Sequence, residues 1–394
     1  MHKAAAALLS FAAVPLSAQA TPNPYLRLME QARDHLRAHT PGLDPAPPPP
    51  VLSPIDASVL DGSVPIEALH QQGIRIVPWT TNDPGTMRRL IDLDVDGIIS
   101  DRPDLLLEVV AEARRSRSVP SSQRVRLPGF DISAHRGGRG LRPENTLPSF
   151  ESGLDNLVTS LETDTGVTSD GKSLLSHDQF FSPESCRRAD RKPYTLDNRV
   201  FIRDISMAEA QRTFICDKLH TRTFPDQRND LALSPVSVAY ARREALRSPY
   251  VPTHAAQLFD FVRFYSDFYR TGLGRTHPHA TERALAAEKV RFNLETKILP
   301  DPLPPEFLAH RDPNLPSDSG ENHTVDPQTF VDTLTRAIGS EHMERRCEIQ
   351  SFDLRTLSLV EEQHPLIPTF YLIEDPRLLS TTFTPELLRQ PTQP

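Results

Sequence analysis

The sequence predicts an α/β protein built as a (β/α)8 barrel, and three observations lead to this prediction. Eight short runs of β-branched or apolar residues are spread along the 394-residue chain, and helical patterns separate most of them. Strands that alternate with helices form parallel sheets, and eight such strands close a barrel. Charged side chains also follow several of the runs, at the strand ends where barrel enzymes place their active sites.

Residues 1–20 have the features of a secretory signal peptide: a basic start, a short apolar run and a small-residue cleavage pattern. A buried N-terminal helix is the alternative interpretation. Residues 21–114 are expected to form the next unit. Within it, the proline-rich residues 41–50 can neither continue a helix nor pair in a central strand, so we expect a semi-rigid spacer there.

Two strands are expected after this spacer, at residues 74–79 and 95–101, because both runs are rich in β-branched residues. The residues between them begin with turn formers and continue as a short helix. A second helix is expected over residues 105–118. Residues 115–128 are expected to form a polar linker to the rest of the chain.

The larger part of the chain, residues 129–394, is expected to supply six strands. Residues from about 180 to 285 fit the alternation poorly, so we predict a long insertion between the third and fourth of these strands, over one end of the barrel. The insertion includes an amphipathic helical pattern, "FDFVRFYSDFYR". The six strand-like runs are "FDISAH", "SLETDT", "SLLSH", "VRFNLETK", "CEIQSF" and "PTFYLI".

The composition narrows the range of functions. Hydrophobic residues make up 38% of the chain, enough for a sizeable core, and the net charge of −8 disfavours nucleic acid or an anionic membrane as a partner. No stretch beyond residue 20 is expected to cross a membrane. The three cysteines lack metal-ligand spacing; Cys186 and Cys216 could pair, a question that the spacing leaves open, and Cys347 is expected to be buried in a strand.

Two strand-like runs carry acidic residues toward one face. Glu162 and Asp164 are two residues apart, as are Glu295 and Lys297, so within each pair the side chains point the same way. Three buried carboxylates repel one another unless a cation neutralises them. Oxygen-only ligands favour Ca²⁺ or Mg²⁺ over zinc. A salt-bridged or surface role is the alternative for any one of these acids.

Two histidines, His135 and His177, end strand-like runs. A lone histidine at such a place is usually structural, but a pair beside a metal is suited to act as acid and base, because imidazole titrates near neutrality. Arg136 and Lys297 add fixed positive charge. With a divalent cation, the site would carry a small net positive charge that suits a singly charged phosphodiester.

Five motifs in order, "AHRGGRGLRPENTLPSF", "LETDTGVTSDGKSLLSHD", "NLETK", "QSFD" and "PTFYL", resemble the glycerophosphodiester phosphodiesterase family. The resemblance implies a (β/α)8 barrel that hydrolyses glycerophosphodiesters to glycerol 3-phosphate and an alcohol. At two turns where the family usually has glycine, this chain has Asn156 and Asp94, and both residue types tolerate a left-handed backbone.

The resemblance also implies a role for each matching residue. His135 and His177 become the acid and base, and Glu162, Asp164 and Glu295 become ligands of a divalent cation, Ca²⁺ or Mg²⁺. Arg136, Lys297 and Trp79 are placed on the substrate and its phosphate, and Glu144 and Asn82 are placed in support.

The last two strands of the family pattern occur at the start of this chain, in residues 73–106, which include Trp79 and Asn82. We therefore expect a circularly permuted barrel, in which residues 21–114 supply strands seven and eight and residues 129–394 supply strands one to six. Two alternatives are a remnant of a preceding repeat, which would leave an open barrel, and completion of a neighbouring chain by swapping.

The expected function is metal-dependent hydrolysis of a small glycerophosphodiester by an exported protein, periplasmic or secreted. Two other functions are open: a phospholipase D-like or lysophospholipid-cleaving activity, in which aromatic residues of the insertion would receive an acyl chain, and a catalytically inactive binding barrel. The sequence sets neither the leaving alcohol nor the oligomeric state.

Overall fold

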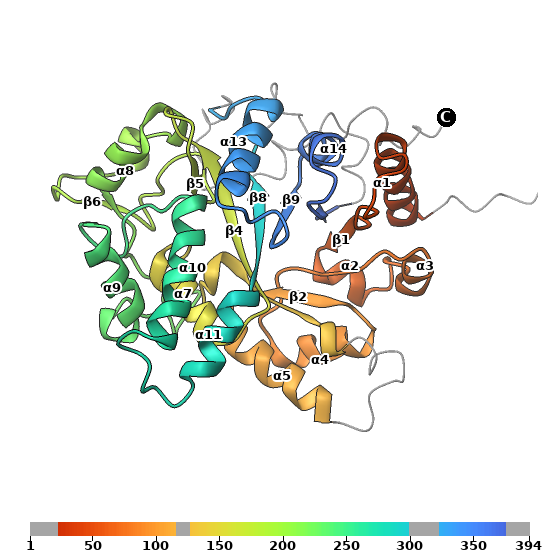
Figure 1. Ribbon diagram of the computed structural model, residues 1–394, viewed down its shortest axis with the longest axis horizontal. Coiled ribbons are helices and arrows are strands. Elements are labelled where there is room, and N and C mark those ends of the chain that lie inside the picture. Colours follow the sequence, from red (N-terminus) through yellow and green to blue (C-terminus); the bar gives the residue numbers. More distant parts are fainter. Residues whose placement is uncertain (1–22, 116–126, 299–322, 376–394) are drawn as a thin grey trace, which may run out of the picture.

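The computed structural model describes residues 23–115, 127–298 and 323–375. A curled sheet of seven parallel strands lies at the centre, with helices around it (Figure 1). Its hydrogen-bonded order is β1, β10, β9, β8, β4, β3 and β2. The strands are β1 (Val51–Pro54), β2 (Gly97–Ser100), β3 (Asp131–Ala134), β4 (Ser160–Val167), β8 (Arg291–Thr296), β9 (Cys347–Ser351) and β10 (Thr369–Ile373).

Residues 75–81 lie between the two ends of this order and join them. On one side the N–H of Val77 donates to the carbonyl of Leu52 in β1 at 2.9 Å, and Trp79 forms a parallel bridge with Ile55. On the other side the N–H of Ile99 in β2 donates to the carbonyl of Pro78 at 3.0 Å. The hydrogen-bonded path therefore returns to its start, consistent with the predicted TIM-like barrel.

Two details of the strand prediction are wrong. Residues 173–177 are not a barrel strand, because β5 (Ser173–Leu175) runs antiparallel to the extended end of β4 and forms a hairpin with it. The missing strand is β1, directly after the proline-rich spacer. Residues 21–114 thus supply three segments of the ring rather than two.

Helices α4, α7 and α13 share one start signal: a side chain that accepts a hydrogen bond from the new helix, followed by proline at the first or second helical position. The capping residues are Asp83, Thr146 and Asp326. The helices are α1 (Pro24–His39), α2 (Asp56–Leu60), α3 (Ile66–Gln71), α4 (Pro84–Asp92), α5 (Pro103–Arg115), α7 (Leu147–Asp155), α8 (Met207–Thr213), α9 (Pro235–Arg243), α10 (Ala255–Arg270), α11 (Ala280–Lys289), α13 (Pro327–Ser340) and α14 (Leu354–Gln363).

The two turns at which this chain has Asp94 and Asn156 in place of glycine differ in backbone conformation. Asp94 has a φ of 71°, as expected for a residue in place of glycine. The prediction for Asn156 is wrong: it caps α7 with a φ of −88°, and the next residue, Leu157, takes the left-handed conformation at 53°. Asn156 donates its backbone N–H to the last turn of α7, so the reversal of the chain falls one residue later.

The segment between β5 and α10 forms a small apolar cluster of its own around Phe181, Phe214 and Ile202. Two short strands, β6 (Arg187–Arg188) and β7 (Phe214–Ile215), pair in it. Cys186 and Cys216 form a disulfide there, which answers the question that their spacing left open. Cys347 is buried and unpaired in β9, as predicted.

This segment lies against the loop that follows β3. The side chain of Gln227 donates to the carbonyl of Arg139 at 2.7 Å, and the N–H of Arg228 donates to the carbonyl of Leu141 at 3.0 Å. Arg102, after β2, forms an ion pair with Asp226 at 2.9 Å. The segment therefore lies at the carboxyl ends of the strands.

The predicted amphipathic helix is α10, and its aromatic residues belong to the main core. Phe259, Phe261 and Tyr265 are fully buried in that core.

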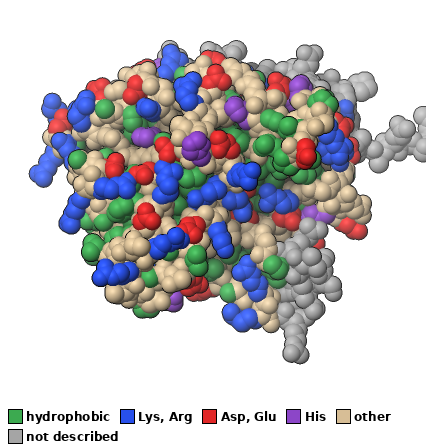
Figure 2. Space-filling model, viewed as in Figure 1, with side chains coloured by type: hydrophobic (Ala, Val, Ile, Leu, Met, Phe, Trp, Pro, Cys, Tyr) green, Lys and Arg blue, Asp and Glu red, His purple; other side chains and the backbone are tan. Residues whose placement is uncertain are grey.

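In the part of the chain that the structure describes, no helix combines the length and the apolar character needed to span a bilayer. Figure 2 shows basic and acidic side chains interspersed over one face.

Candidate active site

Three carboxylates meet at the carboxyl ends of two neighbouring strands. β4 contributes Glu162 and Asp164, and β8 contributes Glu295, which lies directly opposite Asp164 in the parallel register. Each of the three offers an oxygen within 4.8 Å of the other two. Glu162 and Asp164 are inaccessible to solvent, and Glu295 is 6% exposed. The predicted cluster of acids therefore exists.

Neighbouring donors fix each carboxylate. Glu162 accepts from the backbone N–H of Arg136 at 2.8 Å and from the amide of Gln350 in β9 at 2.7 Å. Asp164 accepts from the amide of Asn145 at 3.0 Å and pairs with the guanidinium of Arg136 at 3.1 Å. These contacts hold the two acids in one orientation.

Lys297 completes the ring of charges. Its ammonium nitrogen lies 2.9 Å from Glu295 and 3.7 Å from Asp164, and 5.7 Å from the ring centre of Phe352. The two cations predicted for a phosphate, Arg136 and Lys297, therefore flank the same aspartate.

Burial affects the three acids unequally. Burial and the nearby Asp164 and Glu295 raise the pKa of Glu162 well above its usual range. Burial also raises the pKa of Glu295 to about 7, although Lys297 opposes this. Burial alone would raise the pKa of Asp164 as well, but Arg136 and other positive neighbours lower it well below its usual range.

These residues fit a divalent cation. Oδ1 of Asp164 is buried and accepts no hydrogen bond from the described residues; its charged neighbour is the Lys297 ammonium at 3.7 Å, so this oxygen can accept a further partner. The candidate ligands are all carboxylate oxygens, the type that Ca²⁺ and Mg²⁺ prefer. A cation would also neutralise the repulsion that keeps a proton on this cluster.

His135 follows β3 and lies between two acids. Its Nδ1 is 2.6 Å from Oδ1 of Asp101, which follows β2, and its Nε2 is 3.9 Å from Glu162. The pKa of His135 is lowered to about 4, chiefly by burial, and Asp101 opposes the shift. The neutral ring thus has one nitrogen held by Asp101 and the other directed toward the carboxylates.

The loop after His135 requires glycine and an unusual backbone. Arg136 has a φ of 51°, and Gly137 has a φ of 81°. A Cβ atom on Gly137 would lie 2.8 Å from the backbone of α7, so the loop packs on that helix more closely than a side chain allows. This turn directs both the N–H and the guanidinium of Arg136 toward the acids.

His177 follows the β5 hairpin and is influenced by the charges of the same cluster. Its Nδ1 is 2.9 Å from Asp178, and its side chain is 37% exposed. Burial and the charges of Arg136 and Lys297 lower its pKa. The structure therefore brings both predicted histidines to one end of the barrel, each beside an aspartate.

Glu144 and Asn82 hold other site residues. Glu144 accepts from the guanidinium of Arg136 at 3.0 Å through both oxygens, and its pKa falls to about 2, because Arg136 and Arg139 outweigh burial. Asn82 donates to Asp101 at 2.8 Å and accepts from the N–H of Asp101 at 2.9 Å. Asn82 thus positions the aspartate that holds His135.

Trp79 is connected to the charged cluster through Phe352. Its ring meets Phe352 edge to face, with centres 5.3 Å apart, and Phe352 in turn contacts Lys297. The indole N–H donates to the carbonyl of Ser53 at 2.9 Å.

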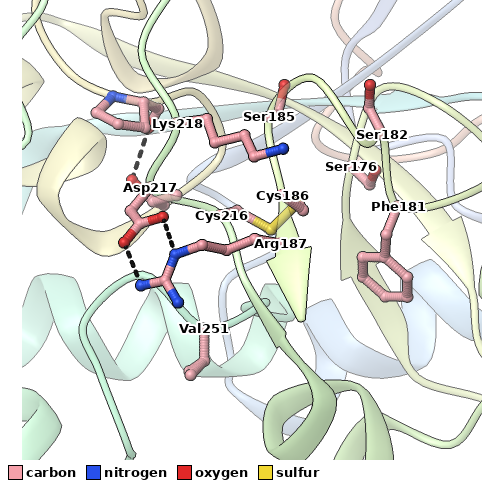
Figure 3. Close-up of a disulfide and its surroundings, with 12 residues drawn as sticks. Ser176, Phe181, Ser182, Ser185, Cys186, Arg187, Cys216, Asp217, Lys218 and Val251 are labelled. Atoms are coloured by element: carbon pink, nitrogen blue, oxygen red, sulfur yellow. Dashed lines mark hydrogen bonds and ion pairs between the residues drawn. A yellow bond between two sulfur atoms is a disulfide. The ribbon is translucent and has the colours of Figure 1, made fainter. Parts of the chain in front are cut away.

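A pocket opens beside His177. Glu144, His177 and Asp178 lie at its polar end, and the disulfide forms another wall. Figure 3 shows the disulfide with Phe181, Ser182 and Ser185 nearby and with the ion pair between Arg187 and Asp217, whose closest atoms are 2.6 Å apart.

The sequence reasoning missed several residues of this site. Asp101 ends the predicted strand at residues 95–101, and Gln350 and Phe352 belong to the "QSFD" motif. Neither pattern by itself predicts a role for these side chains. Arg139 and Asn145 lie in the loop after His135, where the density of polar residues gave no way to separate supporting from exposed ones.

The chain matches the model of the Glycerophosphoryl diester phosphodiesterase family over residues 9–105 and 135–257. A curated relative, the "Probable glycerophosphodiester phosphodiesterase 2" of Mycobacterium tuberculosis, is 44% identical over 45 residues, 11% of this chain and 17% of that protein. The mouse "Lysophospholipase D GDPD3" is 42% identical over 62 residues, 15% of this chain and 19% of that protein. The chain thus covers only a small part of the length of these relatives.

Solved structures give a further comparison. The putative glycerophosphoryl diester phosphodiesterase of Silicibacter pomeroyi has 20% identity and a TM-score of 0.42, with 66% of this chain and 68% of that chain covered. An Oleispira antarctica phosphodiesterase in complex with sn-glycerol-3-phosphate has 16% identity and a TM-score of 0.34, with 61% and 64% covered.

Proposed function

This chain belongs to the glycerophosphoryl diester phosphodiesterase family, and from that premise we propose that it hydrolyses glycerophosphodiesters to glycerol 3-phosphate and an alcohol. The observation that supports this most directly is the convergence of three buried carboxylates, two cations and two histidines at one end of the barrel. A phosphodiester carries one negative charge, which Arg136 and Lys297 are suited to bind.

In the proposed site, Glu162, Asp164 and Glu295 hold a divalent cation, Ca²⁺ or Mg²⁺. When bound, this cation supplies a positive charge that stabilises charge on the phosphoryl oxygens. Arg136 contributes in the same way, because Glu144 and Asp164 fix its guanidinium in place.

The two histidines move the protons. Asp101 holds Nδ1 of His135, so Nε2 is the nitrogen that accepts a proton from the attacking hydroxyl. His177 adjoins the pocket in which we place the leaving alcohol, so it is the group that returns a proton to that alcohol. The attacking hydroxyl is the 2-hydroxyl of glycerol, which forms a cyclic phosphate, or a water molecule; phosphorus NMR during turnover distinguishes the two.

We also propose that the barrel is circularly permuted relative to its family. The support is the strand order, in which β1, residues 75–81 and β2 lie between β10 and β3 although they come first in the chain. If the strands are counted in the order of the family motifs, starting with β3 before His135, β10 is the fifth strand and β1 is the sixth. The permutation therefore opens the barrel between its fifth and sixth strands.

Export is the proposed fate of the chain. The predicted signal peptide, residues 1–20, lies outside the described residues. The disulfide between Cys186 and Cys216 supports export, because such bonds form and persist in oxidising compartments. Expression with a tag at the C-terminus, followed by fractionation and mass measurement, would show whether the chain leaves the cytoplasm and where it is cleaved.

The function is tested by measuring glycerol 3-phosphate release from glycerophosphocholine, glycerophosphoethanolamine, glycerophosphoglycerol and lysophosphatidylcholine, with Ca²⁺, Mg²⁺ or Mn²⁺. We expect turnover of the small diesters, loss of activity in EDTA and recovery on adding the cation. Lysophosphatidylcholine should be poor, because the aromatic residues that α10 contributes to the insertion, among them Phe259, Phe261 and Tyr265, lie in the main core. Absence of turnover with every cation would favour an inactive binding barrel.

A further inference from the structure

Helices α1 and α14 pack side by side although they come from opposite ends of the chain (Figure 1). His35 and His39 are one helical turn apart near the end of α1, and Glu362 lies near the end of α14. Residues four positions apart share one face of a helix, so both imidazoles can face α14.

The three side chains lie within the reach of one ion. Each offers a ligand atom within 4.8 Å of the other two. Nε2 of His35 is 3.3 Å from Oε1 of Glu362, and the two imidazole ring centres are 4.4 Å apart. Nδ1 of His39 lies 2.9 Å from the carbonyl of His35, an arrangement that leaves Nε2 of His39 with its lone pair for a ligand.

A second observation points to a missing partner. His35 is only 6% exposed, yet neither of its ring nitrogens makes a well-aligned hydrogen bond within the described residues, although Nε2 lies 3.3 Å from Oε1 of Glu362. A buried imidazole with such poorly aligned contacts recovers little of the hydration that it loses. A ligand shared with Glu362 and His39 would remove that penalty.

We propose that His35, His39 and Glu362 bind a borderline transition-metal ion such as Zn²⁺. Two imidazoles and one carboxylate match the ligands that Zn²⁺ takes in proteins, with water in the fourth position. The hard cations Ca²⁺ and Mg²⁺ prefer oxygen ligands, which distinguishes this site from the cluster of Glu162, Asp164 and Glu295.

The position of the site indicates its role. His39 ends α1 ahead of β1, and Glu362 is close to the end of α14 ahead of β10, so the site lies at the amino ends of the strands, away from the candidate active site. This end of a barrel serves stability rather than chemistry. The ion would fasten the N-terminal helix to the C-terminal part of the same chain, where β1 pairs with β10.

The test compares Zn²⁺ binding by the full-length chain with that of His39→Ala and Glu362→Gln. Both residues are exposed, so neither change should prevent folding. His279→Ala is the control, because His279 is also exposed and lies 3.3 Å from Glu282 but belongs to no three-ligand cluster among the described residues. Calorimetric titration is done with excess Mg²⁺ to occupy the acidic cluster, and Tm is measured in parallel.

We expect Zn²⁺ to raise the Tm of the unchanged chain and of the control His279→Ala by a few degrees, since Zn²⁺ binds the folded state alone. His39→Ala and Glu362→Gln should bind Zn²⁺ at least ~10-fold more weakly and lose most of the Tm increase. Glycerophosphodiester turnover should be the same in all four proteins, so this result is independent of the proposed function. Equal Zn²⁺ affinity in all four, or a Tm that Zn²⁺ does not raise, would overturn the proposal.

Discussion

His135 shows how the candidate site prepares a single side chain. Asp101 holds one ring nitrogen, and burial keeps the ring neutral by lowering its pKa to about 4. His177 has the same arrangement with Asp178 but greater exposure. Neither histidine is among the candidate cation ligands, so chemistry and cation binding can be separated by mutation.

Replacing His135 or His177 by alanine should lower kcat by about 10²-fold or more, the usual contribution of a general acid or base. Calorimetric titration with Ca²⁺ or Mg²⁺ should show nearly unchanged affinity, because the three carboxylates remain. His279→Ala serves as the control on an exposed histidine. Full activity in both active-site variants would refute the proposed roles.

Asp101→Asn tests a positioning role. The amide can still contact His135, but it cannot favour the correct tautomer or stabilise the charged ring, so we expect kcat to fall at least ~10-fold. KM should change less than kcat, since Asp101 contacts His135 directly, whereas Arg136 is held chiefly by Asp164 and Glu144. Asn82→Asp, which alters the contact behind Asp101, should give a smaller effect in the same direction.

Cation affinity should depend on pH. Burial raises the pKa of Glu162 and brings that of Glu295 to about 7, so the cation-free site binds protons that the cation must displace. Affinity should therefore rise with pH, by up to about tenfold per pH unit for one displaced proton, and level off only once both Glu162 and Glu295 are ionised. Titrations in buffers of different ionisation enthalpy count the protons released.

A variant of Lys297 tests the cause of this pH dependence of cation affinity. Its ammonium lowers the pKa of Glu295, so Lys297→Met should move the rise in affinity to higher pH. A cation affinity that is constant between about pH 6 and 8, or that falls as pH rises, would contradict a protonated cluster.

Some site residues could be read from the sequence and others could not. The two-residue spacing of Glu162 and Asp164 fixes a common face in any strand, so their convergence was predictable. Helix α5 lies between Asp101 and His135 in the sequence, and only the pairing of β2 with β3 brings the two residues together. Contacts of this kind depend on tertiary structure, which local patterns do not contain.

At the scale of elements, short strands were the main difficulty. β1 has only four residues and follows four prolines, so it looked like the end of a spacer. β5 is equally apolar, but it turns back on β4. The apolar residues of a segment indicate whether it forms a strand, but the length of the connection decides whether that strand pairs in parallel. The turn before β5 is too short for a crossover to a parallel strand.

Helix α9 provides a test at this scale. Glu151 of α7 is fully buried and accepts hydrogen bonds from the N–H groups of Val236 and Ser237 at 2.9 and 2.7 Å, at the first turn of α9. Glu151→Gln directs an amide N–H₂ toward these donors and should cost about 1–3 kcal/mol in the free energy of unfolding. Urea denaturation measures the loss.

Ser237→Ala is the matched change for this helix. It removes only the hydroxyl bond to Glu151 and leaves both N–H bonds, so its cost should be smaller than that of Glu151→Gln. Equal stability of Glu151→Gln and the unchanged chain would show that α9 does not depend on this cap.

For the whole molecule, the ring of strands makes permutation testable. Joining residue 394 to residue 21 and opening the chain within residues 116–126 would restore the family order. We expect this rearranged protein to fold and keep its activity, because every strand keeps its neighbours. Circular dichroism and glycerol 3-phosphate release are the measurements.

Deletion is the complementary experiment. Removing residues 21–114 takes away β1, residues 75–81 and β2, and should abolish folding, because β10 and β3 would both become open edges. A soluble, active fragment beginning near residue 125 would show that the N-terminal part is not needed. The sequence predicted that this part completes the barrel, but it missed one of the three segments.

The pairing of β1 with β10 has a consequence for biosynthesis. A strand made early in translation finds its neighbour only when residues 369–373 have emerged, almost at the end of the chain. Contacts this distant in sequence slow folding, so the barrel of the nascent polypeptide should stay incomplete until β10 has left the ribosome. A product truncated before residue 369 would lack this pairing and should not complete the barrel.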